Sequence, residues 1–229
     1  MFLEMLYWKN LMLNKILKLL KLPLYEKYNF LVIQIAKFKT QILYKKIFKN
    51  IGKKTIIKNP MLLKNVNNIS VGNNVFIRDH ARIECVEIKD SQKFNPTLII
   101  EDGVSIEQRC HITAADTLII GKDTLISFDV SIQDTDHEYE DLSTPVANQP
   151  LIVKKTQIGE NSFIGSGAKI QAGTILGKHC VVGTNAVVRG HFPDYSVIVG
   201  VPAKIVKRYD EVSRKWKKTN SKGEFLDEI

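Results

Sequence analysis

Cysteine is scarce in this sequence, and its scarcity excludes a disulfide framework. The 229 residues include only Cys85, Cys110 and Cys180. Disulfide-stabilised scaffolds carry a denser and even-numbered set of cysteines. The composition therefore suits a reducing compartment, and we interpret Cys110 and Cys180 as small buried residues rather than reactive thiols.

Long hydrophobic runs and the features of a signal peptide are also missing. A membrane span needs about 20 apolar residues, whereas Lys15, Lys18 and Lys21 interrupt the first apolar stretch. Glu4 precedes that stretch and no small-residue cleavage site follows it, which argues against a signal peptide. We therefore expect a cytoplasmic protein that does not span the membrane.

Metal-ligand spacing is absent too. The five histidines are scattered along the chain, at His80, His111, His137, His179 and His191. No pair of them has the spacing that would place two ligands on one helical face. We expect no metal site.

What the sequence does contain is a six-residue period. An aliphatic residue begins seven consecutive steps, at Ile152, Ile158, Ile164, Ile170, Leu176, Val182 and Val188. Glycine follows four of the aliphatic residues, and the fifth place is small: Thr156, Ser162, Ala168, Thr174, Cys180 and Ala186. We interpret the aliphatic and small residues as facing inward and the glycines as permissive turn residues. This pattern predicts a β-solenoid of flat strands and tight corners.

The period can be followed backward with short slippages, one of them at Asn95-Pro96. We expect the solenoid to extend from about residue 66 to about 206 and to be interrupted once, at residues 133–151. That segment holds Pro145, Pro150 and five acidic residues but no periodic apolar position, so it should project from the coils. Long excursions from a rigid scaffold are common places for function.

The projecting loop opens on Asp134, Asp136 and His137. Histidine titrates near neutral pH, and a nearby carboxylate can fix its tautomer. The sequence therefore predicts a general base at His137, with Asp134 and Asp136 orienting the base or binding an acceptor. A solvated loop with an idle histidine is the alternative.

Three motifs together resemble a known family. They are Ile132–His137 at the start of the loop, Ile158–Ala168 where the coils resume, and Val199–Lys204 at their end. Over about residues 66–208 they resemble the hexapeptide-repeat acyltransferases, and most closely the O-acetyltransferases of sugars and surface polysaccharides related to galactoside and maltose acetyltransferases. The resemblance implies a mainly β fold, a left-handed parallel β-helix.

The resemblance also implies a mechanism. His137 would remove a proton from an acceptor hydroxyl as that hydroxyl attacks the thioester of acetyl-CoA, so that no covalent acyl-enzyme and no metal is needed. In the family an amide side chain one coil earlier helps to hold the acceptor, and His111 occupies that place in this sequence. This departure leaves three roles open for His111: acceptor binding, proton transfer, or filling a coil corner.

A CoA groove between the subunits of a homotrimer is implied as well. Family members hold the pantetheine arm against backbone and small residues of the last coils, and Gly165, Ser166 and Thr184 are at the matching positions. The 3′-phosphate of CoA needs cations, and Arg189, Lys204 and Lys207 are the candidates. Coil packing would also select small residues, and exposed lysines are commonly only solvated, Lys207 being the weakest candidate.

The charge of the chain is concentrated in residues 1–60. Thirteen lysines against Glu4 and Glu26 give this segment +11, so the remaining residues sum to −2 out of the total of +9. Pro23 divides the segment into two expected amphipathic helices, about 2–20 and 25–48. Residues 1–48 would either contact an anionic membrane or pack on the β-helix. Their dense apolar residues argue against nucleic acid. At the other end, residues 207–229 are expected to form a short helical cap.

The favoured acceptor is a sugar hydroxyl of a cell-surface polysaccharide or of its lipid-linked precursor. An N-acyltransferase of amino sugars and an O-acetyltransferase of small molecules use the same fold, and a general base serves either. Metal-dependent hydration of carbon dioxide is a further alternative, but it needs a larger number of suitably placed histidines than this sequence has. A trimeric scaffold without chemistry is the non-enzymatic alternative.

Overall fold

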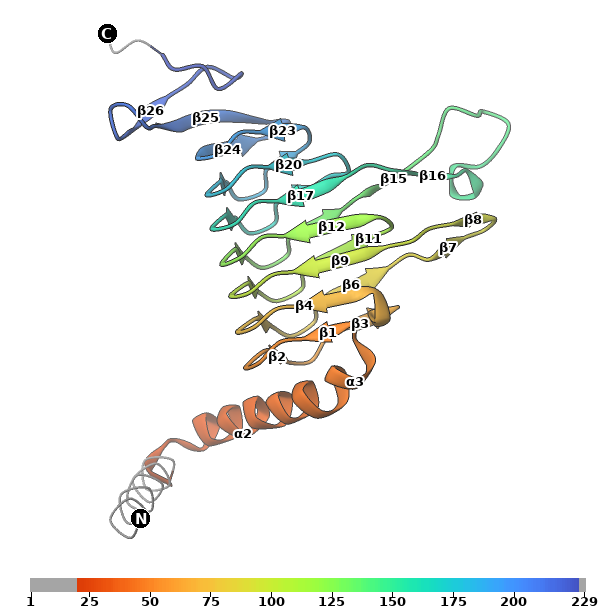
Figure 1. Ribbon diagram of the computed structural model, residues 1–229, viewed down its shortest axis with the longest axis vertical. Helices are drawn as coiled ribbons and strands as arrows, with labels where there is room; N and C mark the ends of the chain where they lie inside the picture. The colour runs from red at the N-terminus through yellow and green to blue at the C-terminus, as the bar shows by residue number, and fades with distance from the viewer. Residues whose placement is uncertain (1–19, 227–229) are drawn as a thin grey trace.

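The main body of the protein is a column of stacked coils, shown in Figure 1. The computed structural model describes residues 20–226. The strands of the coils form three sheets along the column, which we name the first, second and third wall. Neighbouring strands in a wall are parallel except at the C-terminal end of the second wall. This arrangement confirms the solenoid that the six-residue period predicts.

The strands of each wall stack along the column in the order of the chain. The first wall contains β1 (Asn50–Ile51), β4 (Ile69–Val71), β9 (Thr97–Ile100), β12 (Thr117–Ile120), β17 (Thr156–Ile158), β20 (Ile175–Leu176) and β23 (His191–Phe192). The second contains β2 (Ile56–Ile57), β5 (Phe76–Ile77), β10 (Ser105–Ile106), β13 (Leu125–Ile126), β18 (Phe163–Ile164), β21 (Val181–Val182), β24 (Ser196–Gly200), β25 (Ala203–Asp210) and β26 (Lys215–Lys218). The third contains β3 (Leu62–Lys64), β6 (Arg82–Cys85), β11 (His111–Ala114), β14 (Ser131–Gln133), β19 (Lys169–Ile170) and β22 (Val187–Val188).

The core consists of rows of aliphatic side chains inside the column. In the second wall Ile77, Ile106, Ile126 and Ile164 lie in register on consecutive coils, and all four are fully buried. Fully burying such a side chain contributes about 1.5–3 kcal/mol. The period therefore specifies the fold because it delivers one buried aliphatic side chain per wall and coil.

The turn residues occupy a different place from the one expected. Backbone φ is positive at every sixth residue, at Asn161 (57°), Gly167 (71°), Gly173 (84°), His179 (53°) and Asn185 (55°). Each directly precedes the small fifth place of the period, and asparagine and glycine tolerate this left-handed conformation better than most residues. The corner is therefore made by this residue rather than by the glycine after the aliphatic position.

The glycines after the aliphatic positions have a steric role instead. A Cβ at Gly159 would lie 2.4 Å from the carbonyl carbon of Gly177 on the next coil, and a Cβ at Gly165 would lie 2.7 Å from the amide nitrogen of Thr184. Contacts this short would push apart coils that stack at about 4.8 Å. The expected role of these glycines as permissive turn residues is therefore wrong. Their lack of a side chain allows neighbouring coils to stack closely.

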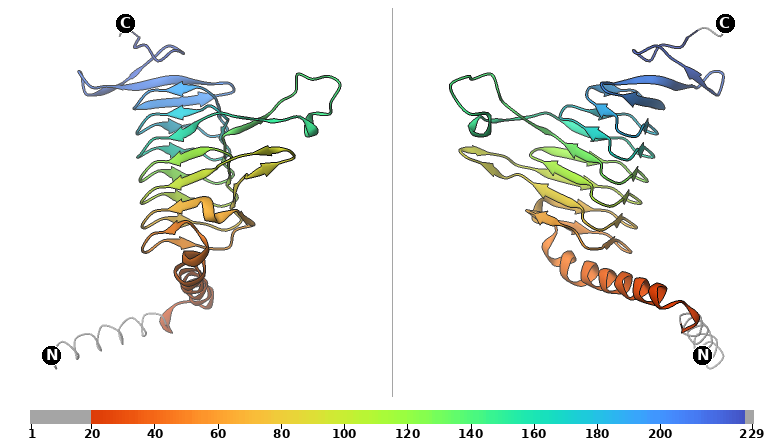
Figure 2. Two further views of the ribbon diagram at one scale, coloured as in Figure 1. Left: turned by 45° about the vertical axis from the view of Figure 1, so that its right-hand side comes forward. Right: turned by 180° about the vertical axis from the view of Figure 1, so that it is seen from behind.

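The column is interrupted twice rather than once. Between β6 and β9 the chain leaves the third wall as an antiparallel hairpin of β7 (Ile88–Lys89) and β8 (Gln92–Lys93). Between β14 and β17 it leaves again through β15 (Thr135–His137) and returns through β16 (Leu151–Val153), with a 3-10 turn η3 (Val146–Asn148) between them. Figures 1 and 2 show both excursions extending from the same side of the column. The sequence showed the first excursion only as a slippage near Asn95-Pro96.

Both ends of the column differ from expectation. The coils begin at β1, Asn50, rather than near residue 66, and a 3-10 turn η2 (Val66–Asn68) lies within them. At the other end the expected helix over 207–229 is wrong as far as residue 226. There β25 folds back on β24 and β26 pairs with β25. Ile205 is buried, and the antiparallel strands that carry it extend the second wall beyond the last coil.

Among the described residues, one helical segment precedes the first coil. It runs through α2 (Leu24–Lys39), a π-helical turn η1 (Thr40–Tyr44) and α3 (Lys45–Ile47). The Thr40 hydroxyl donates to the carbonyls of Ala36 and Ile57 and accepts from the Ile57 amide, so this end packs on the column. Nearly all of the other expected helix, about 2–20, lies outside the described residues. No helix within residues 20–226 is long and apolar enough to cross a membrane.

Candidate functional site

The projecting loop leaves the column at the corner between the third and first walls. Five consecutive coils turn at this corner, through residues 86–96, 115–116, 134–155, 171–174 and 189–190. The hairpin of β7 and β8 therefore lies on one side of the loop, and the corners that carry Gln171 and Arg189 lie on the other. This stack of connections places polar side chains from segments far apart in sequence around the foot of the loop.

His137 is the last residue of β15, and it lies opposite Leu151 of β16. Its side chain is exposed. Within residues 20–226 no hydrogen bond to the imidazole is found. Neighbouring residues on a strand face opposite sides, so Asp136 faces away from His137. The exposed ring is therefore open to contact by an incoming group.

Asp134 has a structural position that the sequence did not predict. Its side chain is fully buried. Its two carboxylate oxygens accept the Ala115 amide at 2.9 and 3.0 Å, and one of them accepts the Asp116 amide at 2.9 Å. Burial raises the pKa of Asp134, against the lowering effect of these N–H donors. Asp134 closes the tight corner below the loop and is not placed to bind an acceptor or orient His137.

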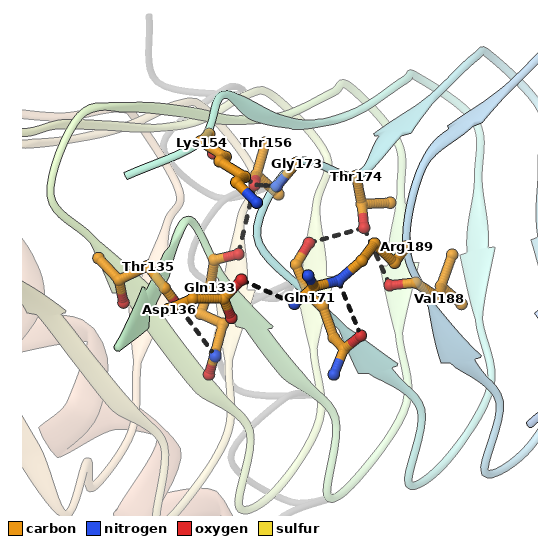
Figure 3. A network of polar contacts seen from close by, with 10 residues as sticks. All are labelled: Gln133, Thr135, Asp136, Lys154, Thr156, Gln171, Gly173, Thr174, Val188 and Arg189. Atoms are coloured by element: carbon orange, nitrogen blue, oxygen red, sulfur yellow. Dashed lines mark hydrogen bonds and ion pairs between the residues drawn. The ribbon is translucent and has the colours of Figure 1, made fainter. Parts of the chain in front are cut away.

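Asp136 is paired with a cation, as Figure 3 shows. An Arg189 Nη atom lies 2.7 Å from an Asp136 carboxylate oxygen, and Arg189 Nε donates to the Gln171 side-chain oxygen at 3.2 Å. The sequence predicted Arg189 as a ligand of the CoA 3′-phosphate and Asp136 as an orienting or acceptor-binding group. The structure joins the two, across 53 residues of sequence, at the foot of the loop.

His111 lies at the opposite edge of the third wall from His137. It pairs in register with Ser131, and His137 follows Ser131 by six residues, which is about 20 Å of extended chain. Its exposed ring lines a groove that Arg109 and Asp129 also line, together with His80 and Lys169. Arg109 donates to both carboxylate oxygens of Asp129 at 2.7 Å and holds the pKa of that carboxyl below its usual range. One chain alone does not bring His111 and His137 together.

The candidates for the pantetheine arm gather at the corner between the second and third walls. Gly165 is buried, and a side chain at this position would collide with the Thr184 backbone on the next coil. The Ser166 carbonyl accepts the Asn185 amide at 2.9 Å. Thr184 is exposed. Coil packing therefore explains Gly165, and the three residues form one edge of the column.

The remaining cation candidates lie at the C-terminal end of the second wall. Lys204 and Lys207 are both exposed on β25, where they pair in register with Val199 and Val197. On the second wall they lie beyond β21 and the corner that carries Thr184, toward the C-terminal end of the column. The site candidates thus fall into two groups at opposite edges of the third wall, with His137 and Arg189 in one and the pantetheine candidates in the other.

The cysteines take no part in either group. All three are buried and free, and burial raises the pKa of Cys85 to about 12 and that of Cys110 to about 11. A thiol with so high a pKa is a poor nucleophile near neutral pH. Over residues 20–226 no group of three His, Cys, Asp or Glu side chains has the arrangement of a metal site.

Sequence comparison relates this chain to transferases. A family model described as "Bacterial transferase hexapeptide (six repeats)" matches residues 155–190. The Escherichia coli protein named "Putative lipopolysaccharide biosynthesis O-acetyl transferase WbbJ" is 31% identical over 170 residues, which cover 71% of this chain and 83% of that protein. A Mycobacterium tuberculosis protein named "Probable acetyltransferase Rv3034c" is 37% identical over 106 residues, covering 40% of this chain and 35% of that protein.

Structural comparison gives the same fold at low sequence identity. A variant of AntD, an N-acyltransferase from Bacillus cereus, was solved with dTDP-4-amino-4,6-dideoxyglucose and coenzyme A. It superposes with a TM-score of 0.65 at 18% identity, over 77% of this chain and 91% of that chain. At this identity the likeness concerns the fold.

Proposed function

This chain belongs to the hexapeptide-repeat transferase family, and on that basis we propose that it is an O-acetyltransferase that uses acetyl-CoA to modify a sugar hydroxyl of a surface polysaccharide or its lipid-linked precursor. The observation that carries the proposal is the similarity to the E. coli protein, which extends over most of both chains. The exposed imidazole of His137 lies on a loop that leaves the coils and has no hydrogen-bond partner within residues 20–226, which supports its assignment as the base that this chemistry needs.

In the proposed reaction the acceptor hydroxyl loses its proton to His137 while its oxygen attacks the acetyl carbonyl. The tetrahedral intermediate then expels the CoA thiolate, which takes up the proton that His137 holds, so the imidazole returns neutral. No acyl-enzyme forms, which agrees with the buried cysteines. His137 is the catalytic residue of this proposal.

A homotrimer would unite the two groups of site candidates. They lie at opposite edges of the third wall, so two copies related by a cyclic axis can bring one edge of each together. His137 and its loop would then face the Gly165, Ser166 and Thr184 edge of a neighbouring copy, with Lys204 and Lys207 near the end of that edge. His111, at the same edge, would lie within reach of an acceptor in this shared cleft.

The base is tested by substitution of His137. We expect His137→Ala to lower the rate of acetyl transfer by at least about 100-fold, the lower range for general base catalysis, while acetyl-CoA binding measured by calorimetry stays unchanged. His191→Ala, which removes another exposed histidine on the first wall, is the matched control. Thiol release from acetyl-CoA with methyl glycosides and nucleotide sugars as acceptors is the assay. A wild-type rate in His137→Ala would refute the assignment.

The bond formed in the product separates the alternative function from the proposed one. The fold neighbour from B. cereus is an N-acyltransferase, and a general base serves an amine as well as a hydroxyl. Hydroxylamine releases acetyl groups from esters and leaves amides intact. Release of the transferred acetyl group supports O-acetylation, and retention would favour N-acylation of an amino sugar.

We also propose that the helix before the first coil contacts an anionic membrane on its cytoplasmic face, where a lipid-linked acceptor would be found. One stripe of α2 and η1 is apolar and exposed, with spacings of four and three residues; it consists of Leu24, Tyr28, Leu31, Ile35, Phe38 and Ile42. Seven lysines against Glu26 give residues 20–49 a charge of +6. An apolar stripe on a strongly basic helix is the combination that anionic bilayers bind.

Vesicle flotation tests this contact. The full chain should float with vesicles of 30% phosphatidylglycerol, and the double variant Leu31→Glu with Ile35→Glu should stay in solution. Val212→Glu, at an exposed apolar residue between β25 and β26, is the control and should float. Equal flotation of the double variant and the wild type would refute the contact.

A further inference from the structure

The tip of the projecting loop is organised around one buried amide. Gln149 is 2% exposed. Its side-chain nitrogen donates to the carbonyls of Asp141 and Thr144 at 2.8 and 2.7 Å, and its side-chain oxygen accepts the Asp141 amide at 3.3 Å. The Asp141 carboxylate in turn accepts the Ser143 amide at 2.8 Å. Residues 141–149 therefore form a small ordered unit, and the orientation of the whole loop depends on what holds it against the column.

The hairpin of β7 and β8 holds it. Gln92 donates from Nε2 to the Leu151 carbonyl at 3.2 Å and accepts the Leu151 amide on Oε1 at 2.7 Å. Its side chain thus pairs with the free edge of β16 as a neighbouring strand would. Lys89 Nζ adds a hydrogen bond to the Ala147 carbonyl at 3.0 Å. Three hydrogen bonds therefore connect the hairpin to the loop across about 60 residues of sequence.

The hairpin itself is anchored to the coils. Glu87, which directly precedes β7, accepts a hydrogen bond from the side-chain nitrogen of Asn68 at 2.7 Å, and its carbonyl accepts the Phe94 amide at 2.8 Å. The Val86 amide donates to the Ala114 carbonyl on the next coil at 2.8 Å. The contacts of Gln92 therefore attach the loop to a hairpin that is itself fixed to the coils.

Leu151, the residue that Gln92 holds, lies directly opposite His137 in the β15–β16 pair. The next hydrogen bond of that pair runs from the Glu138 amide to the Pro150 carbonyl at 2.9 Å. We infer that Gln92 is a positioning residue for His137, acting through the Leu151 backbone to fix β16 and hence the strand that carries the imidazole. This inference rests on the proposed function, because it gives a catalytic consequence to the position of His137.

The consequence should be large for a residue that touches no substrate. A displacement of about 1 Å of a reacting group can cost about 100-fold in rate. The position of Arg189 on the other side of the loop foot does not replace the lost contacts, since it holds Asp136, whose side chain faces the opposite side of β15. The hydrogen bond from Lys89 to the Ala147 carbonyl would remain, but it holds the tip of the loop and not the Leu151 backbone opposite His137.

The test compares Gln92→Ala, Gln92→Glu and Lys93→Ala in the full chain. Amide hydrogen exchange at Leu151 reports the contact without any activity. We expect exchange to be about 5- to 10-fold faster in Gln92→Ala, since one net hydrogen bond changes an opening equilibrium by about that factor. Gln92→Glu should give a smaller change, because its carboxylate still accepts the Leu151 amide. Lys93→Ala, an exposed neighbour on β8, should match the wild type.

Acetyl transfer gives the catalytic readout, with acetyl-CoA and the methyl glycoside or nucleotide sugar that is turned over fastest. Gln92→Ala should lower kcat by about 10- to 100-fold and leave the KM for acetyl-CoA unchanged. In a His137→Ala background, Gln92→Ala should cause no further loss of kcat, because the imidazole that Gln92 positions is then absent. A wild-type kcat in Gln92→Ala would overturn only this inference, as would an equal further loss in the His137→Ala background. A wild-type kcat in His137→Ala would overturn the proposed function and this inference with it.

Discussion

Arg189 offers the sharpest test of the site, because sequence and structure assign it different partners. Charge complementarity at the sequence level predicts contact with the 3′-phosphate of CoA, whereas the structure shows an ion pair with Asp136 at 2.7 Å. The Arg189 side chain is 48% exposed and the Asp136 side chain is 23% exposed. An ion pair this accessible contributes about 1 kcal/mol at most, or about a fivefold change in an equilibrium. A charge-assisted contact with phosphate contributes about 1.5–3 kcal/mol, or roughly 10- to 150-fold.

The loop-holding role and the phosphate-binding role of Arg189 therefore differ in the size of the expected effect and in the kinetic parameter that changes. If Arg189 holds the loop, Arg189→Gln should lower kcat up to about fivefold and leave the KM for acetyl-CoA within twofold of wild type. Asp136→Asn should have a similar effect, and the double variant should be no worse than either single one. The decisive assay repeats the measurements with acetyl-dephospho-CoA, which lacks the 3′-phosphate.

A loop role requires the same ratio of KM values for the two thioesters in wild type and in Arg189→Gln. A phosphate role requires acetyl-dephospho-CoA to bind about 10-fold or more weakly to the wild type and equally weakly to the variant. A KM for acetyl-CoA raised 10-fold or more in Arg189→Gln, with kcat unchanged, would refute the loop role.

Three further predictions concern stability and reactivity. Gly159→Ala should lower the free energy of unfolding in urea by about 3 kcal/mol or more, because its Cβ would lie 2.4 Å from the next coil. Gly190→Ala is the control: with φ of 110° and open space around it, it should lower the free energy of unfolding by only about 1–2 kcal/mol. Equal losses in the two variants would refute the stacking role of Gly159. Burial raises the pKa of Cys110 to about 11, so the folded protein should resist a thiol reagent at pH 8 and react only on unfolding. This raised pKa also means that stability falls as pH rises above the ordinary thiol value toward 11. Donation from Asn73 lowers the pKa of Asp102, so its contribution to stability is complete above the ordinary carboxyl value and is lost as pH falls below it; Asp102→Asn should make urea unfolding less dependent on pH between 5 and 3.

Much of the fold could be predicted from local sequence because the solenoid is itself locally encoded. Each coil repeats the same short pattern, so a buried row such as Ile106, Ile126 and Ile164 is readable as a period without knowledge of any distant contact. The interruption at 133–151 was equally readable from its prolines and acidic residues. The cap after residue 206 was not, since a charged segment with few apolar residues has no decisive period, and pairing with β24 decided that it is a hairpin.

Sequence alone determined that this chain stacks six-residue steps into a column and that His137 stands where the column is broken, because both follow from side-chain size and polarity along neighbouring residues. Only the tertiary structure decided the partners at the foot of the loop. Gln92 meets Leu151, Arg189 meets Asp136, and buried Asp134 meets the Ala115 backbone. Each of these pairs is separated by 19 to 59 residues, and stacked coils bring such residues to one corner only after the walls have formed.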